Sequence, residues 1–132
     1  MKTPFKPKDY NSLSPYLVVE DATALMALMQ NVFNAREKRK YQREDGSILH
    51  AEMRIDDSIV MIANSTDTFQ ATQTVLHLYV PDVMATYGRA LEAGCEGLEV
   101  PVNKKGDPDK RGSFRDPAGN YWSISTQVQE NP

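Results

Sequence analysis

The feature that most constrains this fold is an internal repeat at about half the length of the chain. Residues 17–21 are Leu-Val-Val-Glu-Asp, and residues 78–82 have the similar sequence Leu-Tyr-Val-Pro-Asp. Each segment is typical of a strand that ends in an aspartate suited to cap the following helix. A chain of 132 residues has room for one domain of ordinary size. The repeat therefore predicts one domain made of two related modules.

A helix is expected after each capping aspartate. The helix after Asp21 carries apolar residues at the i, i+3, i+4, i+7 spacing of an amphipathic helix, namely Leu25, Leu28, Met29 and Val32. The helix after Asp82 carries a similar set, namely Val83, Tyr87, Ala90 and Leu91. Asn34 and Gly94 follow these helices at positions where a left-handed residue ends a helix. Both halves of the chain therefore begin as a strand and a helix.

Strand-like segments follow each helix, separated by turn signals. The predicted strands are residues 48–55 and 58–63 in the first half, and residues 98–102, 112–115 and 120–126 in the second. The pattern predicts a βαβββ module over about residues 11–66 and a second over about residues 73–128, with residues 1–10 as an extended basic arm. One helix covers only one face of a sheet, so we expect an α+β fold in which two modules form a concave mixed-sheet cavity with the helices outside.

Composition and charge exclude several classes of function. The net charge of −3 argues against nucleic acid binding. The longest apolar run, residues 59–63, is far shorter than the ~20 residues of a membrane span, and the N-terminus has no apolar signal segment. We therefore expect a cytoplasmic protein without a membrane partner. Cys95 is the only cysteine, which excludes an internal disulfide and a cysteine-cage zinc site. The basic residues within 36–43 and 104–111 are interpreted as solvated faces or loops.

Three phrases carry a resemblance to a known family. They are Ser-Pro-Tyr-Leu-Val-Val-Glu-Asp at residues 14–21, His-Ala-Glu-Met-Arg-Ile at residues 50–55, and Arg-Asp-Pro-Ala-Gly-Asn-Tyr-Trp-Ser-Ile at residues 115–124. Together with the paired modules, they resemble the vicinal oxygen chelate superfamily of glyoxalase I, bleomycin resistance proteins and extradiol dioxygenases. The chain looks closest to its PhnB-like branch. The resemblance implies a homodimer.

The resemblance also implies a divalent metal held by up to four side chains. The corresponding positions hold Ser14, Met61, Val75 and Ser123. Valine and methionine do not bind a hard cation, and serine hydroxyls are poor substitutes for imidazole or carboxylate. We therefore expect no metal and no other cofactor. An alternative is a relocated site of His50, Glu52 and His77, which has a suitable composition but which the family sheet order would spread over separate strands.

Strand alternation predicts which side chains face the cavity. Leu49, Ala51, Met53 and Ile55 are expected in the core, with Trp122 and Ile124. The candidate ligand-binding residues are Tyr16, His50, Glu52, Arg54, His77, Tyr79, Arg115, Tyr121 and Ser123. Each has a structural alternative. The polar residues of 50–54 could form the wet face of a half-exposed sheet, His77 could be a hydrogen-bonded core histidine, and the tyrosines could be ordinary sheet packing.

The leading functional hypothesis is a metal-free homodimer that binds and sequesters a small organic molecule in this cavity. Residues 104–112 could close over the ligand as a lid, with Lys110, Arg111 or Arg115 reaching an anion, or could be an ordinary solvated loop. A rival hypothesis is a lyase or isomerase with His77 as general acid or base and Tyr79 or Glu52 as its partner. A third is a scaffold with an empty cavity.

Overall fold

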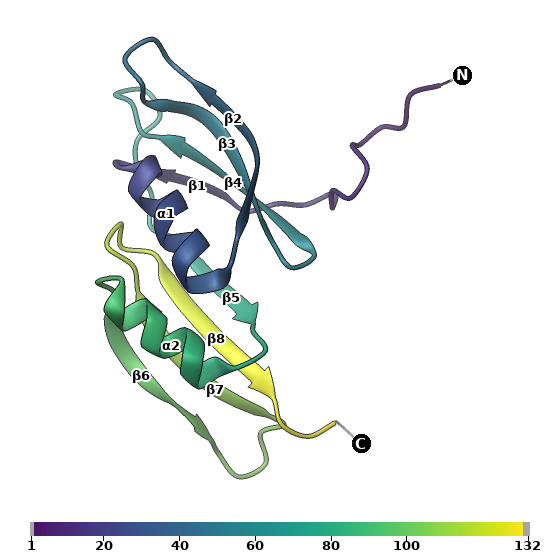
Figure 1. The fold of residues 1–132 in the computed structure, drawn as a ribbon, viewed down its shortest axis with the longest axis vertical. Helices are drawn as coiled ribbons and strands as arrows, with labels where there is room; N and C mark the ends of the chain where they lie inside the picture. Colours follow the sequence, from purple (N-terminus) through teal and green to yellow (C-terminus); the bar gives the residue numbers. More distant parts are fainter. Residues whose placement is uncertain (1, 131–132) are drawn as a thin grey trace. The chain divides into compact units, whose positions relative to one another are not determined.

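The computed structural model describes residues 2–130, in which there are two helices and eight strands (Figure 1). In chain order the elements are β1 (Tyr16–Val19), α1 (Ala22–Phe33), β2 (Arg36–Gln42), β3 (Ile48–Ile55), β4 (Ser58–Asn64), β5 (Val75–Tyr79), α2 (Val83–Glu92), β6 (Glu96–Asn103), β7 (Asp109–Arg115) and β8 (Tyr121–Gln127). The chain divides into two compact units between Thr72 and Gln73, except that residues 31–33 group with the second unit. No helix among residues 2–130 is long and apolar enough to cross a bilayer.

Each unit contains a four-stranded mixed sheet. The strand order is β1-β4-β3-β2 in the first sheet and β5-β8-β7-β6 in the second. The pairs β1–β4 and β5–β8 are parallel, and the other neighbouring strands are antiparallel. In the second unit, α2 lies against β6, β7 and β8 (Figure 1). Both units have the order βαβββ, which confirms the predicted α+β fold.

The predicted helix ends are confirmed. The carboxylate of Asp21 accepts a hydrogen bond from the backbone N–H of Ala24 at 3.0 Å, and that of Asp82 accepts one from Ala85 at 3.1 Å. These bonds satisfy N–H groups that have no partner inside the first helical turn. Asn34 ends α1 with a φ of 57°, and Gly94 follows α2 with a φ of 96°.

The basic run of the first unit is a strand that the sequence did not predict. All residues of β2 are exposed, and the strand pairs only with β3, at the edge of the sheet. Consecutive charges hide the apolar alternation on which strand prediction depends. Charged side chains on an edge strand discourage pairing with another chain. The expectation of a solvated face is therefore confirmed, and the omission of a strand here was wrong.

One predicted core residue lies on the opposite side of the sheet. Ala51, Met53 and Ile55 are buried, whereas Leu49 is 51% exposed. Between β2 and β3 the pairing passes from Tyr41–His50 to Gln42–Ile48, so Leu49 has no partner. Such a bulge reverses the alternation of the strand. The prediction for Leu49 was wrong for this reason, and Ile48 is buried in its place with 1% exposure.

The last loop of the second unit is built around a buried aspartate. Asp116, which begins the turn between β7 and β8, accepts hydrogen bonds from the backbone N–H groups of Ala118 and Asn120 and from the indole of Trp122. Gly119 has a φ of 94°, a conformation that favours glycine. Trp122 packs against Phe33 with a centroid distance of 4.6 Å. The turn therefore fixes the start of β8 and its largest core side chain.

Candidate functional site

A chain of hydrogen bonds crosses one face of the first sheet. Tyr16 of β1 and Glu52 of β3 both pair with Met61 of β4, so their side chains lie on the same face. The Tyr16 hydroxyl lies 3.0 Å from Nδ1 of His50, and Nε2 of His50 lies 2.8 Å from the Glu52 carboxylate. The structure thus brings together three of the predicted site residues: Tyr16, His50 and Glu52.

Glu52 is the buried end of this chain, with only 3% of its surface exposed. One carboxylate oxygen, Oε2, faces His50, and the other accepts a hydrogen bond from the Tyr10 hydroxyl at 2.5 Å and lies 3.7 Å from Nε of Arg39. Burial by itself raises the pKa of Glu52. The opposite effect is larger, because the hydrogen bonds from Tyr10 and His50 and the charge of Arg39 all lower this pKa. The pKa of Glu52 therefore lies below its usual range. Glu52 is therefore ionised at neutral pH.

This ionised carboxylate determines which ring nitrogen of a neutral His50 imidazole carries the hydrogen. A carboxylate only accepts hydrogen bonds, so Nε2 of His50 carries the hydrogen that points toward Glu52. In the neutral imidazole Nδ1 is then an acceptor, and the Tyr16 hydroxyl donates to it. The three groups form a directed chain from an exposed phenol to a buried carboxylate.

Aromatic rings lie beside the exposed part of this hydrogen-bonded chain. The ring of Tyr41 lies 6.4 Å from that of His50, and the ring of Phe69 lies 6.2 Å from that of Tyr16. Tyr16, Tyr41 and Phe69 are 40%, 54% and 53% exposed. Exposed aromatic faces are suited to stacking against a planar molecule. Arg54 is not part of this group, because its Nε donates to the backbone carbonyl of Asp56 in the adjoining turn.

The sequence reasoning missed Tyr10 and Arg39, which complete the environment of Glu52. Tyr10 lies in the predicted N-terminal arm, where no periodicity links it to a strand of the sheet. Asn11 next to it accepts a hydrogen bond from the backbone N–H of Ile59, which ties the arm to β4. Arg39 lies on β2, the strand that the sequence did not reveal. The one sequence signal for Tyr10 was its aromatic side chain, which stands a few residues before β1.

The second sheet carries its own polar face. The strand register places most of the remaining predicted residues there, namely His77, Tyr79, Arg115, Tyr121 and Ser123. His77 lies 3.0 Å from the hydroxyl of Ser125, and the ring of Tyr79 packs against its edge. The Tyr79 hydroxyl donates to Asp109, and Arg111 also binds this carboxylate. Neither expected partner of His77 forms a hydrogen bond with it, because the Tyr79 hydroxyl donates to Asp109 and the Glu52 carboxylate binds His50.

The environment of His77 favours its neutral form. Burial is the main cause, because it disfavours the charged imidazolium, and the positive charge of Arg111 acts in the same direction. The negative charge of Asp109 opposes both, but the pKa of His77 remains below its ordinary value. His77 is therefore a hydrogen-bonded neutral imidazole on this face.

Two other predicted residues of the second unit, Arg115 and Tyr121, have hydrogen-bond partners within the protein. Arg115 donates to the backbone carbonyl of Gly119, and the Tyr121 hydroxyl donates to Glu99. Lys110 and Arg111 belong to β7, so the strand begins inside the segment that was expected to be a loop. Arg111 is held by the two aspartates 107 and 109. A lid over residues 104–112 can therefore involve only the part before β7.

The four positions that the resemblance assigns to the family metal hold no suitable set of donor atoms. Met61 lies between Tyr16 and Glu52 in the first sheet, and Val75 is 77% exposed on β5. Neither side chain binds a hard divalent cation, and the hydroxyls of Ser14 and Ser123 are weak ligands. Among residues 2–130 no three His, Cys, Asp or Glu side chains form a metal-binding group. His50 and Glu52 lie in the first unit and His77 in the second, so neither unit holds the relocated set.

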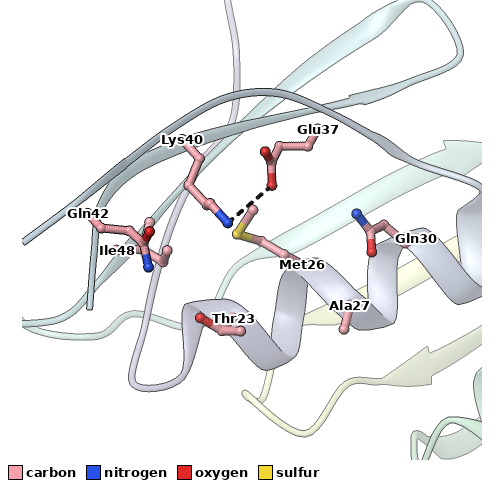
Figure 2. Close-up of a pocket in the computed structure, with 8 residues that line it drawn as sticks. All are labelled: Thr23, Met26, Ala27, Gln30, Glu37, Lys40, Gln42 and Ile48. Atoms are coloured by element: carbon pink, nitrogen blue, oxygen red, sulfur yellow. Dashed lines mark ion pairs between the residues drawn. The ribbon is translucent and has the colours of Figure 1, made fainter. Parts of the chain in front are cut away.

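The first unit also contains a small pocket between α1 and β2, which the sequence did not predict. Its lining residues are Thr23, Met26, Ala27, Gln30, Glu37, Lys40, Gln42 and Ile48. Figure 2 shows Met26 beside an ion pair of Lys40 and Glu37, whose charged atoms are 3.8 Å apart. Its volume of about 220 Å³ is below the ~300–1,000 Å³ of typical ligand pockets. The pocket is therefore a minor feature beside the face that carries His50.

The paired βαβββ units define a recognised class of proteins. Residues 11–124 match the model of the Glyoxalase/Bleomycin resistance protein/Dioxygenase superfamily, and the chain belongs to this superfamily. The resemblance stated from the sequence is confirmed at this level. Two similar curated proteins are the uncharacterised proteins Mb0911c of Mycobacterium bovis and Rv0887c of Mycobacterium tuberculosis. Each is 31% identical over 130 residues, which cover 90% of this chain and 85% and 76% of the two relatives, respectively.

Solved structures show the same fold at lower identity. TioX from Micromonospora sp. ML1 has a TM-score of 0.73 and 21% identity, covering 89% of this chain and 98% of TioX. The fosfomycin resistance protein FosX from Listeria monocytogenes has a TM-score of 0.67 and 18% identity, covering 92% of this chain and 94% of FosX. At these identities the likeness concerns the fold alone.

Proposed function

We propose that this protein binds a small organic molecule on the polar and aromatic face of its first sheet, around His50. The observation that carries the proposal is the hydrogen-bonded chain from exposed Tyr16 to buried Glu52. Its polar groups have defined directions, and the exposed rings of Tyr41 and Phe69 lie beside it. Binding sites commonly combine apolar and aromatic walls with a few oriented polar groups.

The proposed binding requires no divalent metal at the family positions. The donor chemistry of those positions supports this, because valine and methionine stand where imidazole or carboxylate would be needed. Sequestration of a ligand without chemistry is consistent with such a site. FosX is described as a fosfomycin resistance protein, and the superfamily name includes bleomycin resistance. Both antibiotics are therefore reasonable compounds to include in a ligand screen.

The proposal also includes a homodimer in the cytoplasm and membership of the PhnB-like branch. These parts rest on the resemblance of the sequence to the family. Light scattering coupled to size exclusion would measure the mass of the particle. A mass near twice 14.8 kDa supports the dimer, and a mass near 14.8 kDa contradicts it.

A thermal-shift screen tests the binding proposal. The panel contains salicylate as a planar aromatic anion, together with fosfomycin and bleomycin, each with and without EDTA. A bound compound raises the melting temperature as its concentration exceeds its dissociation constant. We expect a shift that persists in EDTA, is lost in His50→Gln and is retained in the matched control His77→Gln.

Two outcomes would contradict this proposal. Loss of the shift in EDTA would overturn metal-free binding. A shift that survives His50→Gln but disappears in His77→Gln would move the site to the second sheet. The second result would favour the acid–base hypothesis based on His77, whose neutral imidazole is able to accept a proton.

A further inference from the structure

We propose that Tyr16, His50 and Glu52 form a proton-transfer unit, in which the Tyr16 hydroxyl exchanges a proton with a planar conjugated weak acid bound beside it. This inference rests on the proposed binding face but adds an activity to it. This hydrogen-bonded unit has one exposed end and one buried end, because Tyr16 is 40% exposed and Glu52 is 3% exposed. The phenol is the most exposed of the three groups, and the proposal therefore places the ligand against it.

The unit is directed by its fixed carboxylate. Both oxygens of Glu52 are engaged, Oε2 by His50 and Oε1 by Tyr10 and Arg39. A carboxylate held at both oxygens orients the imidazole that donates to it, as an aspartate does for the histidine of a catalytic triad. Nδ1 of His50 is left as the acceptor for the proton of Tyr16. Tyr10 and Arg39 are positioning residues in this arrangement.

The proposed step is balanced without a metal or a redox partner. The O–H bond of Tyr16 breaks, and its proton forms an N–H bond at Nδ1 of His50. The resulting phenolate takes a proton from the ligand, whose bonding electrons remain on it as a conjugated anion. The rebuilt Tyr16 hydroxyl then gives its proton to a different atom of the anion, which completes a tautomerisation. The proton on Nδ1 of His50 returns to the Tyr16 oxygen and restores the starting protein. The imidazolium formed in between is stabilised by the carboxylate of Glu52.

The surroundings of the phenol indicate the class of substrate. Phe69, from the segment after β4, lies beside Tyr16, and Tyr41 of β2 and Glu52 of β3 lie beside His50. Arg39 of β2 and Tyr10 of the arm contact the Glu52 carboxylate. The aromatic rings favour a flat molecule. The Arg39 side chain is 45% exposed and lies 3.7 Å from the Glu52 carboxylate, so that the buried negative charge is balanced when an anion binds to this face. An enolisable 1,3-dicarbonyl compound with a conjugated ring has these properties.

Two measurements on the protein itself test the proton-transfer unit. The first is the imidazole ¹⁵N NMR spectrum, in which the sequence contributes only two histidines and His77→Gln assigns both. We expect His50 to carry its hydrogen on Nε2, and to lose this tautomer preference in Glu52→Gln. If the neutral imidazole of His50 carries its hydrogen on Nδ1, the proposal is overturned.

The second measurement is acetylation by N-acetylimidazole, read residue by residue by mass spectrometry. Tyr41 is the matched control, because it is more exposed than Tyr16 and also lies beside His50 but has no hydrogen bond to it. We expect Tyr16 to react at least ~10-fold faster than Tyr41, a modest share of the ~10²–10⁴-fold that a positioned base supplies. His50→Gln should remove the difference, and Tyr10→Phe should reduce it. Equal rates in the wild-type protein would overturn the proposal.

These results are separable from the binding proposal. Salicylate binding without activation of Tyr16 would leave a binding site and eliminate the proton-transfer unit. Activation of Tyr16 without any ligand-induced shift would retain the unit and contradict the ligand class of the binding proposal. Deuterium incorporation into benzoylacetone in D₂O then measures the activity. We expect it to be faster with the wild-type protein than with Tyr16→Phe, and equal rates would overturn the proposed activity.

Discussion

At the residue scale, Glu52 shows how the first sheet stabilises a buried negative charge. An isolated carboxylate is costly to bury unless hydrogen bonds and opposite charge replace its hydration. Tyr10, Arg39 and His50 supply these interactions from the arm, the edge strand and the same strand. Three separate segments of the chain must therefore be in place before Glu52 is stabilised.

The first residue-scale prediction concerns the pH dependence of this carboxylate. Because the pKa of Glu52 is lower in the folded than in the unfolded protein, its stabilising effect is present above the unfolded value and is lost as pH falls through the folded value. Glu52→Gln should therefore reduce the free energy of unfolding by about 2 kcal/mol at neutral pH, as expected for a hydrogen-bonded charge.

Urea denaturation of both proteins at pH 7 and pH 3 measures this effect. The difference between them should shrink at pH 3, because this pH lies below the ordinary pKa of a glutamate and the carboxylate of the unfolded chain is then protonated. Glu37→Gln, on the exposed strand β2, is a control that should change little at either pH. A difference that is as large at pH 3 as at pH 7 would contradict an ionised Glu52.

The second residue-scale prediction concerns Cys95. Burial raises the pKa of its thiol to about 11, and the charge of Asp116 adds to the effect. At pH 8 only about one thiol in a thousand is then ionised, and the thiolate is the reactive form. The native protein should not react with a disulfide reagent such as DTNB within minutes, and one thiol per chain should react in urea. Rapid reaction of the native protein would show that Cys95 is accessible.

At the element scale, the turn before β8 accounts for a phrase that is conspicuous in the sequence. The Asp116 carboxylate organises Ala118, Asn120 and Trp122, and both Asp116 and Trp122 are buried. Asp116→Ala should destabilise the protein by about 3 kcal/mol, because buried donors would lose a charged acceptor. Asp45→Ala provides a comparison in an exposed turn, where the carboxylate binds only Ser47.

Guanidinium denaturation of these two variants measures the difference. The Asp116 variant should show the much larger loss of stability and a changed tryptophan fluorescence, since the indole of Trp122 loses its acceptor. Equal losses in the two variants would mean that the turn does not stabilise the second unit in this way.

The sequence was informative where local chemistry determines structure. Asp21 and Asp82 predict the helix starts because a side-chain oxygen at that position satisfies free N–H groups, whatever the rest of the fold. Leu49 was misplaced because a bulge depends on the neighbouring strand, which local alternation does not contain. Tyr10 was missed for the same kind of reason, since its contact with Glu52 joins residues far apart in the chain.

At the scale of the whole molecule, one βαβββ plan carries two different polar faces. Tyr16 pairs with Met61 in the first sheet, and His77 pairs with Ser123 at the corresponding place in the second. The first face joins a phenol, an imidazole and a carboxylate, whereas the second joins an imidazole to a serine and a tyrosine to an aspartate. The repeat thus conserves backbone pairing while the chemistry of equivalent positions differs.

The last prediction concerns the four positions that the resemblance assigns to the family metal ligands. Valine and methionine occupy two of them, and two serine hydroxyls alone cannot compensate for the cost of dehydrating a divalent cation. Purified without an affinity tag, the protein should contain far less than one zinc, iron, nickel or manganese per chain. Its melting temperature should not change in EDTA or with added Mn²⁺, because an ion that binds the folded state would raise it. In the double variant Val75→His with Ser123→Glu, added Mn²⁺ should raise the melting temperature if these positions retain the family geometry. A native protein that loses stability in EDTA would overturn the metal-free function and return the chain to the metal-dependent chemistry of its superfamily.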